Sequence, residues 1–203
     1  MRLILPRLLG ALAAATLAGA LAAGPPAVGD HPRLAQVQPD AATRAQRLDE
    51  LFARLKTAKV EDDGDDIVAG IWKLWLQSGN AEIDARMHEA ILLMGQGAGA
   101  IAMPILDDIV RRLPDWAEGW NKRATMLYIM GEHDRSLADI DRVLALEPRH
   151  FGALAGQGLI RMDKGEYRAA LAAFRRALAV NPFLKERHGI IPALEKEVGE
   201  KAL

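Results

Sequence analysis

A fixed spacing in the second half of the chain constrains the fold more than any other feature. Three prolines stand 34 residues apart, at Pro114, Pro148 and Pro182. Seventeen residues before each of them stands a glycine, at Gly97, Gly131 and Gly165. A period in this range is typical of stacked repeats, and 34 residues is the length of a helix–turn–helix unit. We therefore expect a repeat architecture whose function is binding.

Composition indicates an all-α protein and excludes several classes of function. Half of the 203 residues are hydrophobic but only 5% are aromatic, so alanine and leucine, both strong helix formers, supply the apolar content. The formal net charge is −1 and no basic stripe is present, which argues against binding to nucleic acid. The chain has no cysteine, which rules out disulfides and thiolate metal sites.

The amino terminus has the pattern of a secretory signal peptide. Arg2 and Arg7 are followed by a charge-free apolar run over residues 8–23, which is shorter than the ~20 residues of a typical membrane span. We expect residues 1–23 to be removed, with cleavage after Ala22 or Ala23, and residues 24–43, which hold four prolines, to form a flexible linker. A bacterial leader of this kind predicts a periplasmic or secreted protein with no membrane span after cleavage. An uncleaved anchor helix is the alternative.

Two units, 117–150 and 151–184, each divide into two amphipathic helices around a glycine and end at a proline. They resemble the tetratricopeptide repeat (TPR) family. In the second unit the family's signature positions are Leu154, Gln157, Gly158, Gly165, Tyr167, Ala170, Phe174, Ala177 and Pro182. In the first unit they are Trp120, Arg123, Ala124, Gly131, His133, Ser136, Ile140, Val143 and Pro148.

The resemblance extends upstream more weakly. We expect degenerate units at 83–116 and 49–82, and a capping helix within 185–203. In the unit 49–82, Trp75 replaces a small alanine of the signature, so the packing of this unit must differ locally. The resemblance implies a right-handed α-solenoid of stacked helix–turn–helix repeats over residues 44–203.

The resemblance also implies that the first helix of each unit lines a concave groove. The side chains expected to point into it are Met87, Ile91, Met94, Asn121, Thr125, Tyr128, Leu159 and Met162. Such a mostly apolar, methionine-rich surface suits a peptide or a partner helix. Only Asn121 matches a residue of the family's carboxylate clamp, so we do not expect that mode. An apolar stripe can equally be core, and a terminal helix can fold over the groove.

No residue pattern predicts catalysis, a cofactor or a metal. The acidic run 61–66 fails as a calcium loop because Lys59 and Gly70 would occupy its first and twelfth positions; we expect a solvated turn whose Asp65 or Asp66 caps the next helix. His150 is expected in a surface or capping role. The chain is thus predicted to be a non-catalytic interaction scaffold of the bacterial envelope that binds a protein or peptide. One alternative is a self-associating solenoid, a homo-oligomer with partly exposed Trp72, Trp75, Trp116 and Trp120. A less favoured alternative is an envelope enzyme.

Overall fold

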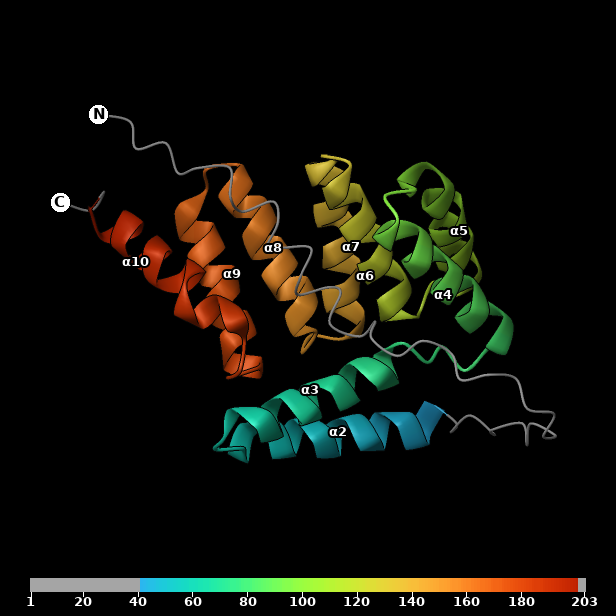
Figure 1. Cartoon of the computed structure of the whole chain (residues 1–203), viewed down its shortest axis with the longest axis horizontal. Coiled ribbons are helices and arrows are strands. Elements are labelled where there is room, and N and C mark those ends of the chain that lie inside the picture. The colour runs from blue at the N-terminus through green and yellow to red at the C-terminus, as the bar shows by residue number, and fades with distance from the viewer. Residues whose placement is uncertain (1–40, 201–203) are drawn as a thin grey trace. The chain divides into compact units, whose positions relative to one another are not determined.

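A computed structural model describes residues 41–200 (Figure 1). The predicted signal peptide and nearly all of the predicted linker lie outside these residues. The helices, in chain order, are α2 (Ala41–Thr57), α3 (Glu61–Trp75), α4 (Ala81–Gly95), α5 (Gly99–Arg112), α6 (Ala117–Ile129), α7 (His133–Leu146), α8 (Phe151–Asp163), α9 (Tyr167–Val180), the 3₁₀ turn η2 (Lys185–His188) and α10 (Ile190–Glu200). The described residues contain no strand, so the expectation of an all-α solenoid is confirmed.

The periodic glycines end the first helix of each pair. Gly97, Gly131 and Gly165 have φ angles of 73°, 77° and 73°, a backbone conformation that side chains disfavour. At Gly131 the turn closes with two backbone bonds, from its own N–H to the Tyr128 carbonyl (2.9 Å) and from the Glu132 N–H to the Leu127 carbonyl (2.8 Å). These bonds satisfy carbonyls at the end of α6. Each 34-residue period of the sequence corresponds to one helix pair: α4/α5, α6/α7 or α8/α9.

Small residues let the two helices of a pair approach closely. A Cβ atom on Gly158 would lie 2.7 Å from the ring of Phe174, which is fully buried. In the preceding pair the Ser136 hydroxyl donates to the Ala124 carbonyl over 2.7 Å. The last pair is closed by α10, whose Ile191 and Leu194 join the buried cluster of α8 and α9. The predicted capping segment therefore forms a 3₁₀ turn followed by a helix.

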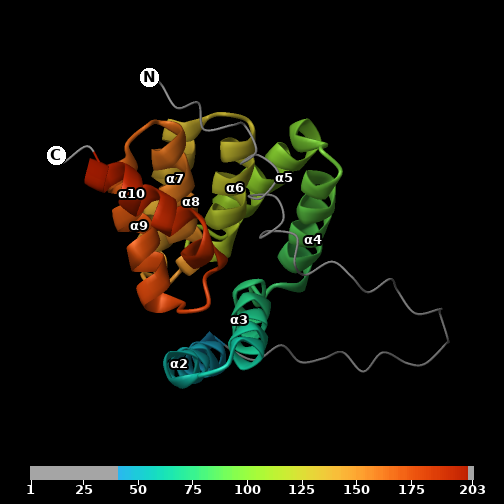
Figure 2. The same ribbon diagram turned by 60° about the vertical axis from the view of Figure 1, so that its left-hand side comes forward.

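The helix pair α2/α3 departs from the expected stack. It begins at Ala41, three residues before the expected start of the domain. Its buried cluster contains Phe151 and Phe183, from the start of α8 and the segment after α9, and no residue of α4–α7. Figures 1 and 2 show α2 and α3 running across the ends of the repeat helices. Trp75 lies in this cluster and stacks on His150, so it does not make the close contact that an alanine makes in a stacked unit.

The acidic run forms the first turns of α3 and is not the solvated turn that we expected. The N-cap is Val60, which provides no side-chain cap. Acidic side chains are favourable at this end of a helix because its dipole is positive there. Two of them face the carboxy-terminal segment: Glu61 lies 3.1 Å from Arg187, and Asp65 lies 3.5 Å from Lys185.

Two glycines in α8 should respond to alanine with opposite signs. Gly158→Ala should lower the free energy of unfolding by about 1–3 kcal/mol, because the new methyl group overlaps the immobile Phe174 ring. Gly156→Ala should raise it by about 0.5–1 kcal/mol, because its Cβ would meet only Ile140 at an ordinary 3.6 Å and alanine favours the helix. Urea unfolding followed by helical circular dichroism measures both changes. A stabilising Gly158→Ala would contradict the close α8/α9 packing.

Candidate functional site

The eight predicted groove residues separate into two groups. Met87 and Asn121 are 1% and 4% exposed, so their prediction as ligand contacts is wrong for this structure. The other six are half-buried and occur on three successive first helices, α4, α6 and α8. We call these six residues the first-helix face: Ile91, Met94, Thr125, Tyr128, Leu159 and Met162.

Met87 and Asn121 are buried for different reasons. Met87 packs inside the cluster of α4, α5 and α6, with Leu106 and Met126. Asn121 lies in the first turns of α6, in a region that α3 covers with Trp72 and Trp75. A folded-over terminal segment was one of the open alternatives, and it holds for the amino-terminal ends of α6 and α8.

Beneath α3 lies a buried polar network that the sequence did not reveal. Glu118 is 1% exposed, and its carboxylate receives three groups. The Lys122 ammonium lies 2.8 Å from Oε1, and the Asn121 amide and the His150 Nε2 each lie 3.0 Å from Oε2. Every one of these partners belongs to α6 or to the residue preceding α8. The i, i+4 spacing of Glu118 and Lys122 was the available signal, but His150 is 32 residues away in the chain.

The hydrogen bonds fix the state of His150. Its Nδ1 accepts the backbone N–H of Ala153 over 3.1 Å and so caps α8, as the capping interpretation predicted, although the ring is fully buried rather than on the surface. An Nδ1 that accepts cannot carry a proton, so the proton is on Nε2, which donates to Glu118. The imidazole is therefore neutral in this arrangement.

Electrostatics keep Glu118 ionised. Burial alone would raise its pKa, but the charge of Lys122 and the hydrogen bond from His150 outweigh burial and lower the pKa to about 2. The network is thus an ion pair with a neutral histidine beside it. Oε2 of Glu118 accepts hydrogen bonds from Asn121 and His150, whereas Oε1 is held by the ion pair with Lys122 alone.

Two tryptophans of α3 cover this network with their ring faces and edges. The Trp75 ring stacks on His150 with centroids 4.0 Å apart and planes 8° apart. The Trp72 ring meets His150 and Phe151 edge-on at 5.5 and 5.4 Å. The Lys122 ammonium lies 5.2 Å from the centroid of the Trp72 ring, within range of a cation–π interaction.

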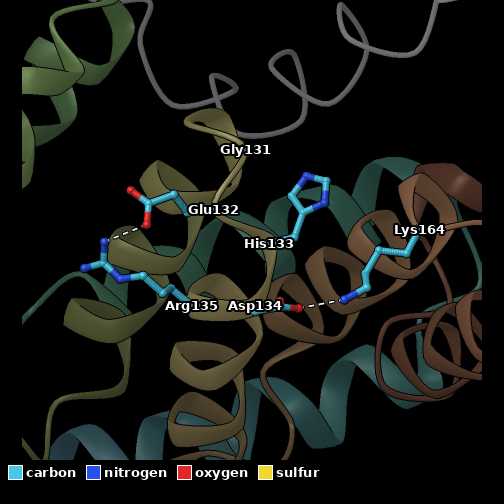
Figure 3. A pocket seen from close by; sticks show the side chains of 6 residues that line it. All are labelled: Gly131, Glu132, His133, Asp134, Arg135 and Lys164. Carbon is cyan, nitrogen blue, oxygen red and sulfur yellow. Dashed lines mark hydrogen bonds and ion pairs between the residues drawn. The ribbon is translucent and has the colours of Figure 1, made fainter.

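The carboxy-terminal ends of α6 and α8 carry the face residues Tyr128 and Met162. The Tyr128 hydroxyl donates to Asp163 over 2.9 Å, and burial together with this bond raises the Tyr128 pKa to about 12. An open depression of about 420 Å³ lies beside it, lined by Gly131, Glu132, His133, Asp134, Arg135 and Lys164 (Figure 3). Its cations are already engaged, Lys164 with Asp134 at 2.6 Å and Arg135 with Glu132 at 2.7 Å.

No group of three or more His, Cys, Asp or Glu side chains in the described part of the chain could hold a metal ion. Within residues 41–200, no helix combines the length and apolar character needed to cross a bilayer.

Comparison with known proteins gives the family. A TPR repeat-containing protein of Rhizobium etli is 39% identical over 137 residues, which cover 68% of this chain and 67% of the relative. The chain belongs to the tetratricopeptide repeat family. No family model matches the sequence of this TPR protein.

Solved structures share the fold of this TPR protein at low sequence identity. The TPR domain of Sgt2 from Aspergillus fumigatus has a TM-score of 0.56 at 18% identity, over 61% of this chain and 83% of that one. The protein MamA has a TM-score of 0.54 at 18% identity, over 70% and 86%. The TPR2B domain of yeast Sti1, solved in a complex with pHsp70, has a TM-score of 0.53 at 16% identity, over 60% and 99%. Proteins with this fold generally mediate protein–protein interactions.

Glu118 should make the stability of this TPR protein depend on acid pH. Its folded pKa is lowered from 4.5 to about 2, so its contribution is present above pH 4.5 and is lost as the pH falls toward 2. Glu118→Gln should lower the free energy of unfolding by about 3 kcal/mol at neutral pH, because Lys122 then lacks its buried partner. The difference in the free energy of unfolding between the native protein and Glu118→Gln should narrow below pH 4.5.

Denaturant unfolding at a series of pH values measures this gap. Glu82→Gln is the matched control, because Glu82 also pairs with an arginine, Arg112, but at the exposed surface, where water screens the pair. A gap for Glu118→Gln that stays constant across the acid range would contradict the ion-pair assignment.

Proposed function

We propose that this TPR protein is a non-catalytic interaction module of the bacterial envelope, which holds a peptide or a partner helix against its first-helix face. The observation that carries the proposal is the partial exposure of six mostly apolar side chains across α4, α6 and α8. Apolar side chains at helical spacing on neighbouring helices suit an amphipathic helix or an extended segment. The complex of the Sti1 TPR2B domain with pHsp70 is consistent with a protein ligand.

Apolar side chains are also exposed elsewhere on the first helices. Leu92 on α4 and Ile129 on α6 are 53% and 60% exposed, and Met130 at the end of α6 is 48% exposed. Methionine adapts its shape to different apolar partners at low cost. A ligand on the first-helix face would bury apolar surface that now contacts water.

The ligand is not expected to be a carboxy-terminal carboxylate. Asn121 was the one residue of clamp type at a groove position, and its amide is buried and donates to Glu118. The remaining face residues offer apolar surface, one threonine and one tyrosine. Affinity should therefore come from apolar contact.

Met94→Glu/Met162→Glu should abolish partner capture while leaving the repeats folded. Both methionines are half-buried on first helices, and a glutamate can keep its methylenes on the protein while its charge opposes an apolar ligand. The measurement is affinity capture from bacterial envelope extract by the native protein and the variant. We expect at least a tenfold loss of a specific partner, which corresponds to ~1.4 kcal/mol or more.

Met103→Glu is the matched control for this capture. Met103 is also half-buried and packs against the same cluster as Met94, but it lies on α5, a second helix. Capture should survive this change. Equal capture by all three proteins, with unchanged circular dichroism, would place the binding surface elsewhere.

The proposal that the protein is exported rests on the predicted signal peptide alone, and it can be tested separately. The full chain expressed in a bacterium should be recovered from the periplasmic fraction with an amino terminus at Ala23 or Gly24, since the apolar run ends in small residues suited to signal peptidase. Intact-mass spectrometry of the fraction measures this. A chain that stays in the cytoplasm and begins at Met1 would overturn the envelope assignment and would leave the binding proposal intact.

A further inference from the structure

The way in which the α2–α3 hairpin (residues 41–75) is attached to the repeats points to a partner. The hairpin docks on segments far away in the chain. A Cβ atom on Gly152 would lie 2.5 Å from the Trp72 ring, and one on Gly64 would lie 2.4 Å from the Phe183 ring. At each end of α3 an aromatic ring thus packs against a glycine. The docking site is therefore shaped specifically for this helix.

The docking site is complete without the hairpin. Glu118, Lys122, Asn121 and His150 bond to one another and to the backbone of α8, and all of these bonds lie within residues 118–153. Above this network α3 contributes ring surfaces. A hairpin that leaves would therefore break none of these bonds, and an identical hairpin could take its place with the same contacts.

A short hinge joins the hairpin to its own repeats. It consists of residues 76–80, and Gly79 within it has a φ of 86°. Five extended residues span roughly 17 Å. No cluster of buried residues joins α3 to α4; the polar ties near the hinge include the Ser78 N–H to Asp84 (2.8 Å) and the Trp116 indole to the Trp75 carbonyl (2.9 Å).

The closed hinge also leaves a polar atom unsatisfied. The Oε1 atom of Gln77 is buried and finds no hydrogen-bond partner among the described residues. A buried polar atom without a partner destabilises the conformation that holds it. Short hinges under strain favour exchange of the element that they carry, because an extended hinge relieves the strain and the docked contacts are retained.

We propose that a second copy of this chain is the partner, and that two copies exchange their α2–α3 hairpins. Each hairpin then docks on the α6, α8 and Phe183 surface of the other copy. This exchange is a closed, two-fold arrangement in which both sites are filled. It does not depend on the ligand of the first-helix face, whose six residues stay uncovered in the exchanged dimer.

Cysteine cross-linking of the full chain tests the exchange. The native chain has no cysteine, so introduced thiols are the only ones present. Asp65 on α3 and Lys185 on η2 lie 3.5 Å apart across the docked interface and are 46% and 65% exposed. Chains with Asp65→Cys and chains with Lys185→Cys, carrying different affinity tags, are co-expressed and treated with a short bifunctional maleimide. Exchange predicts a cross-linked dimer joined between residues 65 and 185.

The matched control uses a contact that does not move. Asp134 and Lys164 lie 2.6 Å apart within the repeats, so Asp134→Cys and Lys164→Cys chains should give no cross-link between copies. The chain with both Asp65→Cys and Lys185→Cys shows whether the hairpin docks on its own repeats. A cross-link found only within that single chain would overturn the proposal, as would a dimer that lacks the 65–185 link.

The hinge offers a second, independent variant. Insertion of about six glycine and serine residues after Ser78 relieves the strain and lets the hairpin return to its own repeats. We expect the dimer fraction, measured by light scattering at one protein concentration, to fall at least fivefold. An unchanged dimer fraction would contradict hairpin exchange.

Discussion

The stack of Trp75 on His150 joins the two dissimilar parts of this protein. The imidazole caps α8, donates to Glu118 and presents its face to the indole at 4.0 Å. These three roles require one protonation state, because a ring that accepts at Nδ1 is neutral when its proton is on Nε2. A neutral ring can be buried beneath an indole without the desolvation cost of a charge. The charge of Glu118 is instead balanced by Lys122, which lies beside Trp72.

The docked hairpin divides the surface of the first helices into two halves. At the amino-terminal ends of α6 and α8, α3 covers the polar network, and this half is a structural interface. At the carboxy-terminal ends, the side chains of the first-helix face reach solvent. The half that carries Tyr128 and Met162 is therefore the part of this surface that α3 leaves uncovered.

The periodic part of the fold could be predicted from the sequence, because each repeat is defined by contacts within about 34 residues. Gly131 and Gly165 located the turns, and Gly158 marked the close contact with α9. The hairpin could not be placed in this way, because its partners lie far away in the chain, as for Asp49 and Arg149, which are 100 residues apart. The sequence marked Trp75 as a misfit in a stacked unit. It carried no information on where the ring would pack instead.

The α2–α3 hairpin contacts two well-matched repeats at a position where their sequences differ. The second position of each unit is Glu118 in one and Gly152 in the other, and the sixth is Lys122 in one and Gly156 in the other. In the first unit these side chains form the ion pair that Trp72 and Trp75 cover. In the second unit a side chain at Gly152 would overlap Trp72. The turn glycine and the closing proline are the same in both units. At the second position the difference follows the path of α3: Trp72 lies over Lys122, the ion-pair partner of Glu118, in the first unit and against Gly152 in the second.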